Sequence, residues 1–219
     1  MMRLCVTTTA IPSRQANVST AIPSGSSINL SGTGSRLSKV PSEIKIAVGP
    51  WKRVEPLGEH HDKTAFSCGQ VAIDHWLHDE ALNQQRQGNI SVWVCVDEQD
   101  RLCAFFASRV HVLSVPTSLS STRRKHWGVN ERGFAPAFMI AKLGLDRALQ
   151  GRGYGKVLLH EALRKCVEAA DRAACKLIVV DALDDRLVSF YENQGFVPIE
   201  GRRLILSVKA VRKSLRPLA

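Results

Sequence analysis

The stretch QGRGYG, Gln150–Gly155, decides the fold predicted for this chain. It follows an apolar segment over 138–145 that has the character of a strand, and it opens an amphipathic segment over 152–170 with helical periodicity. Glycines between a strand and a helix allow backbone N–H groups to converge on an anion, and the helix dipole adds partial positive charge there. The stretch therefore predicts a phosphate or pyrophosphate site near the middle of the chain.

The glycine spacing excludes two common phosphate sites. A Walker loop needs a glycine five positions before its Gly-Lys pair and a Ser or Thr after it, but Gln150 and Val157 stand there. A dinucleotide fingerprint needs a glycine at its sixth position, where this chain has Lys156. The acidic residue expected about 20 residues later is also poorly placed, since Asp181 comes further on.

The pattern that remains, Gln-x-x-Gly-x-Gly, resembles the acyl-CoA loop of the GNAT (Gcn5-related) N-acetyltransferases. In that family, backbone amides of the loop hold the pyrophosphate of coenzyme A. The resemblance implies acetyl-CoA as co-substrate, no metal, and an α+β GNAT fold with a mixed central sheet flanked by helices. The cofactor-binding residues that it implies are Leu143, Gly144, Leu145, Gln150, Gly151, Arg152, Gly153, Tyr154, Gly155 and Lys156. A helix entry with incidental glycines is the alternative.

A second motif, Tyr191 followed by Gly195 and Phe196, matches the late GNAT signature on the helix after the central strand. The family places this tyrosine hydroxyl beside the thioester sulfur, so the resemblance implies that Tyr191 is the general acid. The chemistry is coherent, because attack by an amine on a thioester expels a thiolate that a phenol can protonate. A tyrosine that only packs between the helix and the sheet is the alternative.

The N-terminal half narrows the resemblance to the GNAT-type toxins of bacterial type II toxin–antitoxin modules. The residues that carry it are Phe66–Gly69, Asp74, Trp76, Leu77, Ala81 and Gly88, together with Leu143–Asp146. The resemblance implies acetylation of the α-amino group of aminoacyl-tRNA, inhibition of translation, a homodimer and a cognate antitoxin. The chain departs from that family at Lys142, where arginine is common, and at Phe105-Phe106, where a paired tyrosine is common.

The motifs contain no obvious dedicated general base. A lysine side chain, with a pKa of about 10.4, needs a base to become an uncharged acceptor, whereas an α-amino group, with a pKa of about 7.7 to 8.0, is already partly neutral. Glu192 and Asp181 are close in sequence, but either is equally a surface or strand-end carboxylate. This weakly favours an α-amino acceptor.

The formal net charge of +10 favours a polyanionic partner such as nucleic acid, and the excess of basic residues continues beyond residue 50. The candidate tRNA contacts are Arg123, Arg124, Lys125, Lys142, Arg202 and Arg203. A solvated basic surface is the alternative for each group. Two other functions stay open: a GNAT enzyme acting on a small-molecule amine or a protein N-terminus, and a basic nucleic-acid-binding module without catalysis.

The chain divides into two parts. Residues 1–42 are rich in Ser and Thr without apolar periodicity, which predicts a disordered tail or an over-extended start of the reading frame, and residues 43–219 form the GNAT domain. The six cysteines form no C-x-x-C pair and are interpreted as reduced thiols of a cytoplasmic protein. No apolar run reaches the length of about 18 residues that a transmembrane helix needs, so no membrane association is expected.

The expected elements follow from periodicity and turn residues. Strands are expected at 44–51, 90–97, 102–115, 137–145, 176–182, 196–199 and 203–208, helices at 74–87, 152–170 and 184–194, and a polar loop at 118–136.

Overall fold

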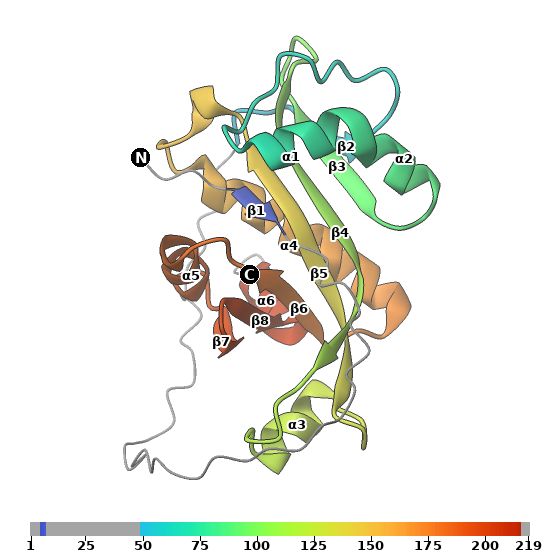
Figure 1. Ribbon diagram of the computed structural model, residues 1–219, viewed down its shortest axis with the longest axis vertical. Coiled ribbons are helices and arrows are strands. Elements are labelled where there is room, and N and C mark those ends of the chain that lie inside the picture. The colour runs from blue at the N-terminus through green and yellow to red at the C-terminus, as the bar shows by residue number, and fades with distance from the viewer. Residues whose placement is uncertain (1–4, 8–48, 216–219) are drawn as a thin grey trace, which may run out of the picture.

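Two long neighbouring strands, β4 (Leu102–Ser114) and β5 (Phe134–Leu145), form the centre of the sheet in the computed structural model, which describes residues 5–7 and 49–215. The sheet has eight strands among these residues, in the order β2-β3-β4-β5-β6-β8-β7, with β1 paired to β5 (Figure 1). Only the β5–β6 pair is parallel among the described pairings. The other strands are β1 (Cys5–Thr7), β2 (Arg53–Pro56), β3 (Ser91–Val96), β6 (Leu177–Asp181), β7 (Val197–Glu200) and β8 (Arg203–Ser207). The predicted mixed sheet is therefore confirmed.

Helices cover both faces of the sheet because successive strand residues point to opposite sides. Phe105 packs with the helical segment that α1 (Val71–His75), a π-helical turn at Trp76–Glu80 and α2 (Ala81–Arg86) form together. Phe106 packs with α4 (Tyr154–Ala173) on the other face. The remaining helices are α3 (Ser121–Trp127), a 3-10 turn at Arg147–Leu149, α5 (Asp185–Glu192) and α6 (Val208–Leu215), of which α6 packs on α4.

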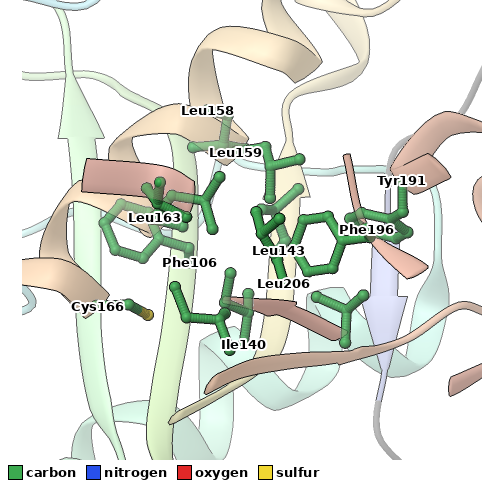
Figure 2. Packing of buried hydrophobic residues seen from close by; sticks show 14 of the residues in the cluster. Phe106, Ile140, Leu143, Leu158, Leu159, Leu163, Cys166, Tyr191, Phe196 and Leu206 are labelled. Carbon is green, nitrogen blue, oxygen red and sulfur yellow. The ribbon is translucent and has the colours of Figure 1, made fainter. Parts of the chain in front are cut away.

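The core beneath α4 positions both predicted motifs. The helix buries Leu158, Leu159, Ala162, Leu163 and Cys166, whose spacing places them on one face. Figure 2 shows this cluster, with Tyr191 and Phe196 at one end and Cys166 at the other. Full burial of one such apolar side chain stabilises the fold by about 1.5 to 3 kcal/mol. The core therefore holds the α4 entry and the α5 tyrosine on one rigid support.

Several expected elements differ from the structure. The polar loop at 118–136 contains α3, which Ser120 caps by accepting a hydrogen bond from the Arg123 N–H. The last strand ends at Ser207, and α6 follows because Val208 and Val211 bury against the core. The strand expected at 44–51 is wrong in its bounds: β2 begins at Arg53, residues 49–51 are not a strand, and 44–48 lie outside the described residues. Within the stretch predicted to be a tail, Cys5–Thr7 form β1, and the other residues of 1–42 lie outside the described part.

A bulge in β5 decides which residues face α4. The β4–β5 register passes from Ala107 opposite Lys142 to Ser108 opposite Ile140, so β5 carries one extra residue, Ala141. Ile140 and Leu143 both reach the core beneath α4, although strict alternation would place them on opposite faces. Lys142 therefore points to the other face of the sheet, which we call the front face.

The buried cysteines are free thiols in the described part of the chain. Cys95, Cys103 and Cys166 are buried thiols, and burial raises the pKa of Cys166 to about 12. Among the described residues, no helix combines the length and the apolar character that crossing a bilayer requires.

The close contact between Gly144 and Phe105 yields a stability prediction. A Cβ at Gly144 would lie 2.5 Å from Cε1 of Phe105, whose fully buried ring is 5.6 Å from that of Phe66 and 6.1 Å from that of Trp76. We expect Gly144→Ala to lower the free energy of unfolding by about 1 to 3 kcal/mol, measured by urea denaturation. Combining it with Phe105→Leu should cost less than the sum of the single changes. Strictly additive costs would contradict this contact.

Candidate functional site

The glycine-rich loop has the geometry of an anion cradle. Gly151 and Gly153 have φ of 78° and 84°, the left-handed region that glycine adopts without strain. Gly153 is the N-cap of α4 and makes no side-chain cap hydrogen bond, and the first turn contains no acidic residue. A Cβ at either glycine would meet nothing within 4 Å, so space lies open in front of the helix. Exposed Arg152 and Lys156 flank this cradle.

Gln150 holds the cradle in place. Its side chain is buried, and its Nε2 donates hydrogen bonds of 2.8 Å to the carbonyl of Leu145 and 2.9 Å to the carbonyl of Cys68. These bonds join the end of β5 and the segment before α1 to the start of the loop. The Gln150 side chain therefore makes its hydrogen bonds within the protein, and the backbone of the following residues is the part that can face a ligand.

The Phe66–Gly69 segment and Asp74 support the same loop from the N-terminal half. Asp74 accepts hydrogen bonds from Ser67 Oγ at 2.7 Å and from the Cys68 N–H at 2.8 Å. Burial of this carboxyl opposes its ionisation, but the hydrogen bonds from Cys68 and Ser67 outweigh burial and lower the pKa of Asp74. The Arg147 N–H in turn donates to the carbonyl of Ser67. The sequence motif over 66–77 thus has a structural function, which is to fix the segment that Gln150 contacts.

The strand edge before the loop is the second part of the site. β5 pairs with β6 only through Ala137–Met139, although β5 continues to Leu145 and β6 to Asp181, so the two strands separate beyond that point. Leu143 and Leu145 are buried beneath α4, so this stretch offers its backbone to the opening. Lys142, on the front face, has its Nζ 5.5 Å from the ring centroid of Trp76, and burial lowers its pKa.

Tyr191 lies in the core that supports the cradle. Its fully buried ring makes edge-to-face contacts with Phe190 at 5.2 Å and Phe196 at 5.3 Å between centroids. Asp184 caps α5 by accepting from the Leu187 N–H, which fixes the helix that carries the tyrosine. Tyr191 and Leu143 belong to one buried cluster (Figure 2). The structure therefore brings the predicted tyrosine and the strand edge together.

The predicted basic residues fall into two separate groups. Arg203 pairs with Asp181 through bonds of 2.7 and 2.8 Å, and Arg202 contacts Asp185 at the start of α5, so both lie near the tyrosine helix. The α3 group, Arg123, Arg124 and Lys125, lies at the other end of β4 and β5 from the cradle (Figure 1). Arg124 donates to two loop carbonyls and is structural, whereas Arg123 lies over the Trp127 ring and lines a groove of about 510 Å³.

Two residues of β4 were missed by the sequence reasoning. Arg109 lies on the front face, where its charge acts on Lys142 and on His111. Burial, together with the charges of Arg203 and Arg109, lowers the pKa of His111, and its Nε2 makes no hydrogen bond within the described part of the chain. Alternation along β4 places Arg109 and His111 on the same face as Phe105 and Leu113, but it does not say that these two polar residues approach the site.

A further polar cluster is formed by β2 and the segment that follows it. Glu55, His60 and His61 place potential ligand atoms within 4.8 Å of one another. Hydrogen bonds from the Gly58 N–H to His61 Nδ1 and between His61 Nε2 and Glu55 already account for this arrangement. A cavity of about 610 Å³ beside it is lined by Asp62, Asp97, Asp100 and Asp146, among others, and these carboxylates are unfavourable to a polyanion.

The sequence matches known proteins over most of the described residues. The family described as "Acetyltransferase (GNAT) family" matches residues 68–196. A probable toxin TacT of Sinorhizobium fredii is 30% identical over 179 residues, which cover 75% of this chain and 96% of that protein. The tRNA-acetylating toxin of Mycobacterium tuberculosis is 31% identical over 159 residues, which cover 71% of this chain and 92% of that protein.

Solved structures share the fold. A crystal structure of a Tyr-to-Phe mutant of KacT has a TM-score of 0.66 at 20% identity and covers 74% of this chain and 97% of that one. AtaT complexed with acetyl-methionyl-tRNAfMet has a TM-score of 0.65 at 20% identity and covers 73% and 96%. These similarities confirm the predicted fold.

The double hydrogen bond of Gln150 generates a prediction. Gln150→Leu keeps a similar volume but leaves the carbonyls of Leu145 and Cys68 buried without that donor. We expect a loss of about 2 kcal/mol in the free energy of unfolding and weaker binding of coenzyme A. Denaturation and calorimetry measure the two effects. The exposed Gln99→Leu is the matched control, and an equally small effect in both variants would contradict the anchoring role.

Proposed function

The chain belongs to the GNAT family of acetyltransferases, and we propose that it transfers the acetyl group of acetyl-CoA to the α-amino group of aminoacyl-tRNA and so inhibits translation. One observation carries the choice of acceptor: a relative named as a tRNA-acetylating toxin matches 71% of this chain at 31% identity. The TacT relative and the basic charge of the chain support the same choice. Because aminoacyl-tRNA is found in the cytoplasm, we place the protein there.

The cradle suits the pyrophosphate of acetyl-CoA. The open space at Gly151 and Gly153, the uncapped start of α4 and the absence of acid from its first turn all favour a bound anion. We propose that the backbone N–H groups of Gly151–Gly155 hold the pyrophosphate and that the exposed cations Arg152 and Lys156 add attraction. Acetyl-CoA supplies an acyl group activated as a thioester.

We assign the proton-donating role to Tyr191. Its hydroxyl is a donor in a core that excludes water, and the contacts with Phe190 and Phe196 restrict the ring to one orientation. A fixed donor near the strand edge can deliver a proton to the leaving thiolate at the moment of transfer. The α-amino acceptor needs little help from a base, because its pKa of about 7.7 to 8.0 leaves part of it uncharged at neutral pH.

The front face provides the charge that an RNA acceptor stem requires. Lys142, Arg109, Arg202 and Arg203 lie on this face or beside α5, and phosphate contacts from such residues position a nucleic acid. We propose that this group, rather than the distant α3 group, approaches the acceptor end. We also propose a cognate antitoxin and a homodimer as partners; exposed Val110 and Val112 on β4 and Phe134 on β5 provide an apolar surface for association.

Removing the tyrosine hydroxyl tests the chemistry. We expect wild-type protein with acetyl-CoA to stop in vitro translation and to yield acetyl-aminoacyl-tRNA by mass spectrometry. Tyr191→Phe should reduce the rate of acetylation about 100-fold or more, because only the proton donor is lost. Unchanged binding of acetyl-CoA to the variant is the control. Intact translation with wild type would contradict the tRNA acceptor, and acetylation of amines or protein N-termini instead would support the alternative enzyme.

Adding a negative charge to the cradle tests the cofactor site. Gly153→Asp places a carboxylate at the N-cap, in the open space facing the proposed pyrophosphate, and we expect no measurable binding of acetyl-CoA by calorimetry. Gly88→Asp is the matched control, because Gly88 also has a positive φ of 73° and open surroundings. Equal affinity in the two variants would show that the loop is wrongly assigned, and absence of binding in wild type would leave only the non-catalytic module.

A further inference from the structure

β1 occupies the edge of β5 next to the cradle. The antiparallel pairing places Cys5 opposite Gly144, Val6 opposite Leu143 and Thr7 opposite Lys142. This stretch of β5 lies beyond the end of the β5–β6 pairing, and β1 also contacts β6 and α1. The N-terminal strand therefore lies in the opening between the two separating strands (Figure 1).

The same edge is the natural path for the pantetheine arm of acetyl-CoA, a step that rests on the proposed function. The cradle begins six residues after Gly144, and Tyr191 shares a buried cluster with Leu143. An extended chain that carries amides pairs with an unpaired strand edge as an added strand does. The arm and β1 thus require the same backbone donors and acceptors.

We propose that β1 is an autoinhibitory strand, which competes with acetyl-CoA for the edge of β5 and must leave before the acetyl donor enters. A three-residue strand is suited to this function, because so short a pairing is marginally stable and opens readily. If β1 occupies the edge for about three quarters of the time, the dissociation constant of acetyl-CoA is raised about fourfold. The occupancy of the β5 edge by β1 therefore sets the fraction of molecules that can bind acetyl-CoA.

Paired proline substitutions in the full chain test the competition. Adjacent residues of an antiparallel strand point their N–H groups to opposite sides, so Val6→Pro with Thr7→Pro removes whichever donor faces β5. The matched control exchanges the two residues, Val6→Thr with Thr7→Val, and keeps both donors and the β-branched side chains. We expect the proline variant to bind acetyl-CoA about threefold more tightly or better by calorimetry, and the exchange variant to bind as wild type does.

Hydrogen–deuterium exchange provides an independent measurement. Saturating acetyl-CoA should accelerate exchange in the peptide containing Cys5–Thr7 and keep Lys142–Gly144 protected. Equal affinities of wild type and proline variant, or slower exchange at Cys5–Thr7 with acetyl-CoA, would overturn the autoinhibitory function while leaving acetyl transfer in place. Absence of acetyl-CoA binding in all three proteins would overturn the proposed function itself. Circular dichroism checks that the proline variant retains its fold.

Discussion

The buried side-chain amide of Gln150 is the interaction on which the site depends. Its hydrogen bonds connect three segments: the end of β5, the segment before α1 and the glycine-rich entry to α4. If the two carbonyls lost this donor, each would stay buried without the hydrogen bond. The loss in folding free energy would then exceed the net contribution of two neutral hydrogen bonds. The N-terminal half of the chain therefore reaches the cradle through Gln150 and through the bond from the Arg147 N–H to Ser67, and Asp74 holds the Cys68 backbone in place.

The separation of β5 from β6 is the second constraint. Parallel pairing over Ala137–Met139 holds the two strands together at one end, and the core under α4 holds the tyrosine helix at the other. The space between them is bordered by a backbone edge rather than by side chains, because Leu143 and Leu145 turn into the core. A backbone edge of this kind can pair with an extended chain that carries amides.

Local features were predictable from sequence, and features that depend on distant partners were not. The glycine spacing and the Tyr191 motif each span only a few residues, so the glycine-rich loop and the helix that carries Tyr191 could be located from sequence. Short amphipathic helices such as α3 and α6 carry few apolar residues, and their stability comes from contacts that only the fold supplies. Arg109 belongs to a strand without a local motif that would single it out. The position of β1 depends on an edge of β5 that exists only after the sheet has formed.

The bulge at Ala141 has a consequence for comparing relatives. One surplus residue of backbone reverses the side of the sheet to which every later residue of β5 points. A relative that lacks this residue therefore needs a one-residue gap at position 141 in an alignment, because the gap keeps column 142 on the front face and column 143 in the core. Without that gap, every later column of β5 would pair a residue that points into the core with one that points to the front face.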